Sequence, residues 1–156
     1  MTNIMDPSFG AALNGLPNPR TQSGFYAGVP LKRAIAWVFD GFVVFLLTIA
    51  FSVLTFGLGF FVFFGAWALF SFLYRSATLT TGSATWGMRV MSIELRDGNG
   101  QRLTGGQAVL HTLGTIFSFA TGLQLVSIAM MLLTERGQGL TDAVLNTTAL
   151  NKAARA

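Results

Sequence analysis

The chain has 156 residues, 52% hydrophobic and only 10% charged, and because a soluble domain usually carries about 25% charged residues, this composition excludes an ordinary soluble protein of such length. Cysteine is absent, which excludes disulfides, thiolate nucleophiles and cysteine-based metal sites. The net charge of +4 comes from basic residues scattered singly around apolar segments, a distribution typical of the cytoplasmic flanks of membrane helices and not of a nucleic-acid-binding surface.

Residues 1–29 predict a flexible, soluble tail, because proline, glycine, asparagine and serine are frequent in them. They lack a basic start followed by an apolar core, so they do not form a secretory signal. A lead without a role of its own is the preferred interpretation, and a docking segment for a partner is the alternative. Residues 30–150 form the predicted membrane domain, and residues 151–156 form a C-terminal tail.

The first apolar stretch, residues 31–74, is too long for one membrane crossing. No Asp, Glu, Lys or Arg occurs at positions 41–74. As a single helix the stretch would measure about 66 Å, roughly twice the hydrocarbon thickness of a bilayer. The natural reversal is the Phe-Gly-Leu-Gly sequence at 56–59, where two glycines relieve the backbone. We therefore expect helices over about 31–55 and 59–74.

The segment 88–104 differs in character and predicts a strand, a tight turn and a second short strand. Its Asp-Gly-Asn-Gly sequence, at 97–100, is a strong turn signal. Open strand edges cannot be left in lipid, so we place this small β-hairpin in the cytoplasm. The tail at 143–150 alternates weakly in hydropathy and is a candidate strand that pairs with residues 88–95.

The second apolar stretch, residues 107–133, fits either one long, tilted span or two short helices at about 106–121 and 123–134. With an even number of crossings, all ten basic residues lie on one side of the membrane, whereas three crossings would place the last three outside, against the positive-inside tendency. We therefore predict an all-α membrane protein with two transmembrane helical hairpins, about four helices with three as the alternative. Both termini are expected in the cytoplasm, and the short second hairpin need not reach the far surface.

Asp40, an acidic residue within the first predicted helix, is the first candidate site residue. It follows Arg33 by seven residues, so the two share a helix face about 10 Å apart along the axis. A carboxylate at the centre of a spanning helix costs about 2.5 to 3.5 kcal/mol, so it must be paired, protonated or facing water. Asp40 is therefore either a hydrogen-bonded tie between helices or a proton or cation site.

His111, the only histidine, stands near the cytoplasmic start of the third helix, at a depth resembling that of Asp40. It is the candidate partner of Asp40, because a pair would lower the cost of burying either group and could titrate near neutral pH. A polar interfacial residue is the simpler interpretation. One histidine with one aspartate makes a poor metal site, so we expect neither a metal nor a cofactor.

The remaining residues predict no enzyme site. Lys32, Arg75 and Arg136 flank the apolar segments and are expected to anchor them at the membrane interface. The glycines at 98–100 lack the following helix and lysine of a phosphate loop, and no serine, histidine and aspartate form a convincing triad. The aromatic residues at 39–72 are explained by lipid contact and helix packing. We therefore expect no catalytic residue.

Three motifs, in this order, resemble the RDD family of bacterial membrane proteins. They are Lys32-Arg33-Ala34 with Asp40, the stretch Gly82-Ser83-Ala84-Thr85-Trp86-Gly87-Met88-Arg89-Val90 before a strand with Asp-Gly, and Gly139-Leu140-Thr141-Asp142 before the tail. The resemblance covers about residues 30–150. It implies that the arginine and two aspartates of the family name correspond to Arg33, Asp40 and Asp142. The chain departs from the family pattern at His111, where an arginine is common, and at Thr141, where a histidine often precedes the last aspartate.

The resemblance implies a multi-pass protein of the bacterial inner membrane, and transport of unknown ligands, or sodium/proton antiport, has been suggested for the family. One hypothesis is a small oligomeric transporter of ions or small ligands, in which Asp40 exchanges a proton or cation while Arg33 and Asp142 gate or brace the cytoplasmic mouth. The other is a non-catalytic accessory or scaffold subunit of a larger membrane complex. The expected partners are the lipid bilayer and either further copies of the chain or that complex. For Asp142 a turn or helix cap is slightly preferred over a ligand role.

Overall fold

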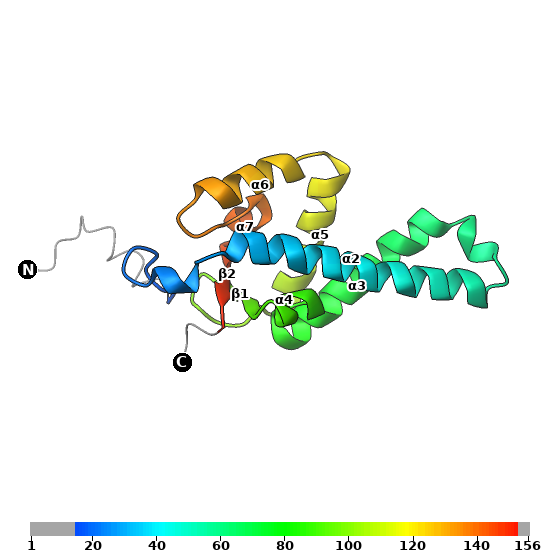
Figure 1. Ribbon diagram of the computed structural model, residues 1–156, viewed down its shortest axis with the longest axis horizontal. Coiled ribbons are helices and arrows are strands. Elements are labelled where there is room, and N and C mark those ends of the chain that lie inside the picture. Colours follow the sequence, from blue (N-terminus) through cyan, green and yellow to red (C-terminus); the bar gives the residue numbers. More distant parts are fainter. Residues whose placement is uncertain (1–14, 153–156) are drawn as a thin grey trace, which may run out of the picture.

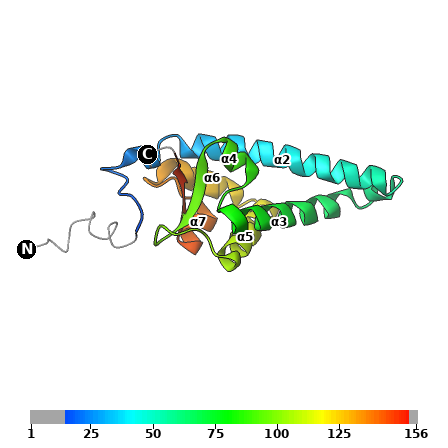
Figure 2. The ribbon, with the colours of Figure 1, turned by 90° about the horizontal axis from the view of Figure 1, so that it is seen from below.

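The computed structural model describes residues 15–152, and residues 1–14 and 153–156 lie outside this part. Two long helices, α2 (Val29–Leu54) and α3 (Phe63–Gly82), form a hairpin whose tip projects away from the rest of the molecule (Figure 1). Shorter helices and a two-stranded sheet surround the other end of α2, as the perpendicular view also shows (Figure 2). The molecule therefore has an elongated helical arm and a folded end.

The polar side chains of α2 are satisfied within the helix or against its neighbours. Thr48 and Ser52 donate hydrogen bonds to the carbonyl oxygens four residues earlier, at 2.8 and 2.9 Å, so they can be buried without a partner on another element. The chain then reverses through the short 3₁₀ turn Leu58–Phe60. A side chain at Gly59 would lie 2.6 Å from the Cα atom of Ser52, so only glycine permits this close reversal, which includes the predicted turn at 56–59.

Helix α3 continues to Gly82, beyond the predicted end at Tyr74. The sequence predicts that end because Arg75, the first charged residue after the apolar run, is typical of a membrane interface. In the structure 17% of the Arg75 side chain is exposed, and its Nη1 lies 3.9 Å from the carboxylate of Asp40. The helix therefore does not have to end where the first charge appears.

The predicted β-hairpin at 88–104 is wrong in its second strand. Residues Trp86–Val90 form helix α4, and strand β1 (Ile93–Asp97) pairs antiparallel with strand β2 (Thr147–Asn151). The turn after Asp97 exists, but residues beyond it lead away, because the amide of Leu103 donates to the Ser83 hydroxyl at 2.8 Å. The alternative partner, the C-terminal tail, is confirmed as the strand beside β1.

Helices α5 (Gly105–Ala120) and α6 (Gln124–Leu133) form the second apolar unit and are bent by 113° at their break. At 1.5 Å per residue they are about 24 and 15 Å long, less than the roughly 30 Å of a hydrocarbon core. In the described part of the chain, Ser23–Leu54 is long and apolar enough to cross a membrane alone, and α5 and α6 qualify only as a pair. The helices of the second apolar unit are therefore shorter than α2, which has 26 residues.

Residues 15–28, which the sequence predicts to be flexible, instead pack against the sheet end. Leu16 is only 4% exposed, and the hydroxyl of Tyr26 donates to the carbonyl oxygen of Pro17 at 2.7 Å. The backbone at Gly15 lies so close to Asn99 that a side chain on Gly15 would collide with it. The apolar side chains of Leu16, Tyr26 and Leu150 form a small cluster of their own there, which proline and glycine content did not indicate.

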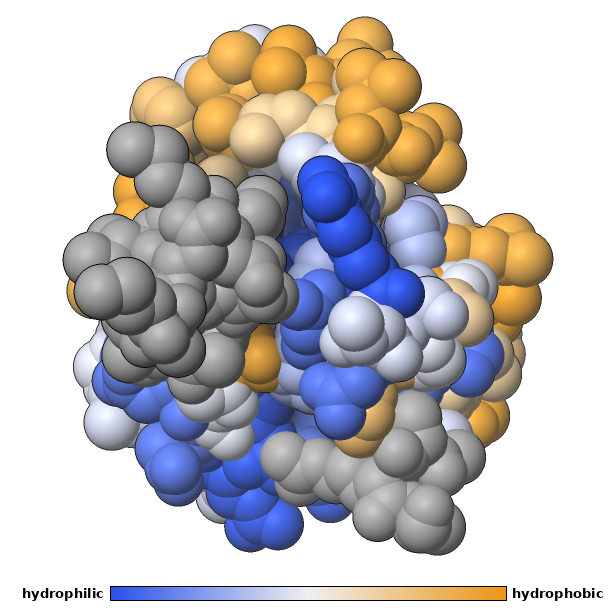
Figure 3. Space-filling view, turned by 90° about the vertical axis from the view of Figure 1, so that its left-hand side faces the viewer, coloured by the Kyte–Doolittle hydropathy of each residue, from blue (hydrophilic) through white to orange (hydrophobic). Residues whose placement is uncertain are grey.

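Apolar surface and polar surface are separated along the molecule. Figure 3 views the end where the sheet lies, with hydrophilic side chains at its centre and hydrophobic ones along its upper and right-hand rim. At the opposite end, the tip of the α2–α3 hairpin exposes Phe56, Phe61 and Phe64, which are 99%, 88% and 87% exposed. This division is typical of a protein whose helices lie in lipid and whose sheet end meets water.

Candidate functional site

The first polar cluster surrounds Asp40 on α2, which is 3% exposed. Its Oδ1 accepts hydrogen bonds from the Tyr74 hydroxyl at 2.7 Å and the Gly87 amide at 2.9 Å. Its Oδ2 accepts one from the Thr85 hydroxyl at 2.6 Å, and Nη1 of Arg75 lies 3.9 Å away. Both oxygens of this carboxylate are therefore filled by donors from α3 and from the start of α4.

This cluster explains the conformation of the Gly82–Val90 segment. Thr85 is the N-cap of α4, and its hydroxyl oxygen accepts from the Met88 amide at 3.2 Å while its proton goes to Asp40. A side chain at Gly87 would collide with the Ala36 carbonyl oxygen and lie 2.9 Å from Asp40 Oδ1. The glycine thus lets α4 approach α2 closely enough for its backbone to bind the carboxylate.

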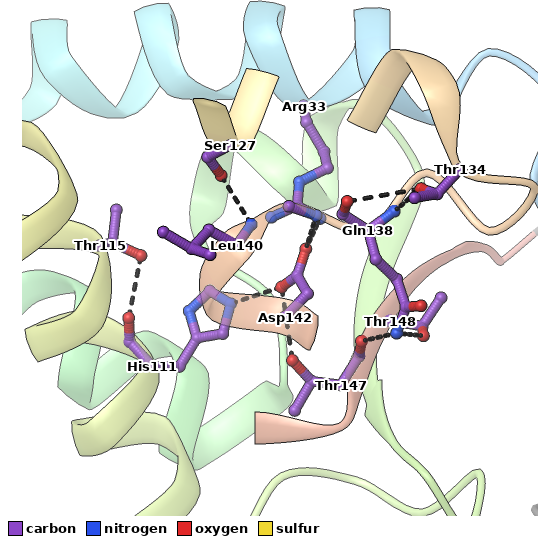
Figure 4. A network of polar contacts seen from close by, with 11 residues as sticks. Arg33, His111, Thr115, Ser127, Thr134, Gln138, Leu140, Asp142, Thr147 and Thr148 are labelled. Atoms are coloured by element: carbon purple, nitrogen blue, oxygen red, sulfur yellow. Dashed lines mark hydrogen bonds and ion pairs between the residues drawn. The ribbon is translucent and has the colours of Figure 1, made fainter. Parts of the chain in front are cut away.

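The second polar cluster surrounds Asp142 on α7 (Leu140–Leu145), whose side chain is fully buried. Arg33 reaches it from α2 and forms an ion pair with Oδ2, while Nε2 of His111, on α5, lies 2.8 Å from Oδ1 (Figure 4). The Gly139 amide donates to Oδ2 at 3.0 Å, and the Thr147 hydroxyl lies 3.3 Å from Oδ1. A single carboxylate therefore joins two helices, its own helical turn and strand β2.

The charge of Asp142 is held by these neighbours. Burial alone raises the pKa of this carboxyl, but the positive charge of Arg33 and the hydrogen bond from His111 lower it by more, so the pKa lies well below its usual 3.8. Asp142 is consequently ionised at neutral pH, and removing any of its partners would leave a buried charge under-compensated.

The expected Asp40–His111 pair is wrong. The partners of Asp40 are Tyr74, Thr85, Gly87 and Arg75, whereas His111 bonds to Asp142. Similar depth along two helices did not make the groups neighbours, because α3 and the start of α4 supply the partners of Asp40, and α7 supplies the partner of His111. The imidazole keeps one unused atom, Nδ1, which is buried and has no hydrogen-bond partner in the described structure.

The predicted basic site residues Arg33, Lys32 and Arg136 lie near different parts of the fold. Arg33 does share α2 with Asp40, but the two side chains serve different clusters. Lys32, an expected interface anchor, donates to the side-chain oxygen of Asn151 at 2.7 Å and so ties α2 to strand β2. Arg136 lies close enough to Tyr26 for its charge to act on that phenol.

Sequence reasoning missed the hydroxyl and amide donors of both clusters. The signal for the first was present, because Thr85 and Gly87 lie in the Gly82–Val90 motif that carries the family resemblance. The Thr147 hydroxyl had no such signal. No group of three or more histidine, cysteine or acidic side chains suited to a metal ion occurs within residues 15–152.

Comparison with known protein families gives a match over most of the chain. The model described as "RDD family" matches residues 27–146, which is more than half of the chain. A search of curated proteins and a search of solved structures gave no match. The matched range contains both polar clusters apart from Thr147, and includes the residues Arg33, Asp40 and Asp142.

Proposed function

The chain belongs to the RDD family and is a membrane protein, and from this premise we propose that it is a non-catalytic accessory or scaffold subunit of a larger complex in the bacterial inner membrane. The sheet end and both termini lie on the cytoplasmic side in this proposal. The α2–α3 hairpin crosses the bilayer, and α5 and α6 enter it only part of the way.

The observation that carries the proposal is the saturation of both buried carboxylates. Asp40 accepts three hydrogen bonds and Asp142 has an arginine, a histidine, an amide and a hydroxyl around it. A transported cation or proton needs an open oxygen to bind, and these oxygens are occupied by groups that hold the elements in place. The two aspartates are therefore better suited to fixing a shape than to exchanging a ligand.

The outer surface supports a role in assembly. Large apolar side chains are exposed along α2, α3, α5 and α6, from Leu31 at the folded end to Phe64 near the hairpin tip. Near its tip the α2–α3 hairpin extends beyond the shorter α5 and α6. Neighbouring proteins or lipid must therefore cover the apolar side chains there.

Purification from native membranes in a mild detergent tests the proposal, with chemical cross-linking before solubilisation. We expect one membrane protein to be cross-linked to the α2–α3 hairpin in constant ratio. The pair should persist through size-exclusion chromatography. A chain that is found only as a free homo-oligomer would contradict a scaffold role.

One observation favours a second candidate, an ion- or proton-coupled transporter. The Nδ1 atom of His111 is buried without a partner while Nε2 bonds to Asp142, and an unused imidazole nitrogen can carry a proton. This function predicts proton flux in proteoliposomes that is lost in His111→Gln. The transporter function would be eliminated if vesicles with the wild-type protein showed no more proton flux than protein-free vesicles.

A further inference from the structure

We propose that Arg75 is the centre of a phosphate-binding site on α3, one that takes the phosphate of an anionic membrane lipid or a free phosphate ion. The first observation is that its donors are unused. A guanidinium has five N–H donors, and within residues 15–152 none of them makes a hydrogen bond. The nearest anionic atom, Oδ2 of Asp40, is 3.9 Å from Nη1, and Nε is buried without a partner.

The carboxylate of Asp40 does not serve as the acceptor for the Arg75 guanidinium, because its oxygens already accept hydrogen bonds from other groups. Tyr74, Thr85 and Gly87 donate to Asp40 at 2.6 to 2.9 Å. Asp40 therefore positions Arg75 and balances part of its charge, but it leaves the donors of the guanidinium free. Buried donors without acceptors are rare in proteins, and such groups commonly mark a bound ion or water.

A second positive charge makes this place suitable for an anion. Arg33 is near enough for its positive charge to act on Arg75. Among the protein's hydrogen-bonding side chains, arginine matches phosphate best, because its planar fork donates two parallel hydrogen bonds. The chemistry of these donors thus favours a phosphate oxygen over a neutral acceptor.

The position of Arg75 along α3 fits the lipid headgroup region. Exposed residues of α3 are apolar at Phe64, Leu69 and Leu73 and become polar at Thr80 and Thr81. Arg75 lies between these two sets. Nearby, the half-exposed ring of Trp86 packs edge-on against Tyr74, with ring centroids 5.8 Å apart, as is common for aromatic residues at the membrane interface. The partly exposed side chain of Arg75 is therefore reachable from the interface.

Native mass spectrometry of the full-length, delipidated protein in mild detergent tests the site. Phosphatidylglycerol and inorganic phosphate are titrated separately. Four proteins are compared: wild type, Arg75→Gln, Arg75→Lys and Arg102→Gln, the last a control because Arg102 is exposed in the loop before α5. We expect about tenfold weaker binding for Arg75→Gln and an intermediate loss for Arg75→Lys, which keeps the charge but loses the fork. Arg102→Gln should bind as the wild type does.

The outcomes separate the sources of phosphate and the competing explanations. Binding of the lipid alone supports a headgroup site, and binding of inorganic phosphate supports a site for the free ion. Arg75→Lys decides the matter if Arg75→Gln does not fold, since it retains a positive partner for Asp40. The proposal is overturned if wild-type protein binds neither ligand, if Arg75→Lys binds as tightly as wild type, or if Arg102→Gln loses as much affinity as the Arg75 variants.

Discussion

At the scale of the residue, Asp142 concentrates the most interactions on one side chain. Its two oxygens face Arg33, His111, the Gly139 amide and the Thr147 hydroxyl. These contacts connect α2 and α5 with α7 and β2, which follow one another at the end of the chain. Because the side chain is fully buried, the cost of losing one of these partners is not reduced by solvent.

The low pKa of Asp142 makes stability depend on acid. The folded protein holds the pKa of this carboxyl below the ordinary 3.8, so its contribution is present above about pH 4 and is lost as the pH falls further. We expect the melting temperature in detergent to fall progressively as the pH drops below about 4. Asp142→Asn should be unstable already at neutral pH and should lack this acid-dependent component. Glu135→Gln, which changes an exposed carboxylate paired with exposed Arg20, should melt as wild type does. An acid profile shared by Asp142→Asn and wild type would contradict the assignment.

Gly87 offers a second test, of the contact between α4 and α2. A methyl group there would press on the Ala36 carbonyl and on Asp40, so Gly87→Ala should lower stability by about 1 to 3 kcal/mol. Gly41→Ala is the matched control, because a Cβ at Gly41 meets no atom within 4 Å and alanine favours a helix. Thermal unfolding measures both. Equal melting temperatures for the two variants would show that α4 does not pack as described.

Residue types at the candidate site could be predicted from sequence, but their pairing could not. Asp40 and His111 were identifiable because a charged or titratable group is costly in an apolar run. Which donor reaches which carboxylate depends on where α4 and α7 return to α2. The position of a residue along its own helix does not predict this packing. The error at Asp40 came from choosing a charged partner, whereas hydroxyl and amide donors from α3 and α4 fill its oxygens.

At the scale of the element, the apolar helices were the most predictable part. Lengths of α2, α5 and α6 agree within a few residues with the predicted ranges, because apolar runs and glycines mark their ends. The strand pairing was harder. The Asp97–Gly100 turn is a strong local signal for a hairpin, but β1 pairs with β2, more than forty residues away along the chain. A local turn does not determine which strand lies beside β1.

A pair of introduced cysteines tests the sheet directly. Leu95 lies opposite Ala149 in the register of β1 and β2, and opposed residues in an antiparallel pair have Cα atoms about 4.5 to 5.5 Å apart, within the range of a disulfide. The double variant Leu95→Cys with Ala149→Cys should form an intramolecular disulfide in mild oxidant, detected by mobility on a non-reducing gel. No native cysteine competes. Cross-linking of Leu95→Cys to Arg102→Cys instead would favour the local hairpin.

At the scale of the whole molecule, the two apolar units differ in reach. Helix α2 has 26 residues, about 39 Å, whereas α5 and α6 are each shorter than the hydrocarbon core. In the proposed orientation the hairpin tip reaches the far surface and the α5–α6 turn remains within the membrane.

Cysteine labelling in sealed vesicles distinguishes these depths. We expect Leu58→Cys, at the tip, to react with a membrane-impermeant maleimide from the side opposite the sheet. Thr121→Cys, at the α5–α6 turn, should not react from that side, and Arg102→Cys should react only from the sheet side. Labelling of Leu58 and Thr121 variants to the same extent from the far side would require two complete crossings of equal depth.

The central claim for the whole molecule is that Asp40 is a structural tie between the long hairpin and the folded end. Asp40→Asn leaves Arg75 without an anionic partner and one of the three hydrogen-bond donors without an acceptor. The variant should therefore lose about 3 kcal/mol or more of stability. Carboxylates kept for ion binding are commonly held at a cost to stability, and their removal then stabilises the protein. The decisive measurement is thermal unfolding of purified Asp40→Asn in detergent, beside wild type and Glu135→Gln. The structural account predicts a markedly lower melting temperature for Asp40→Asn alone, and an unchanged or higher one would contradict it.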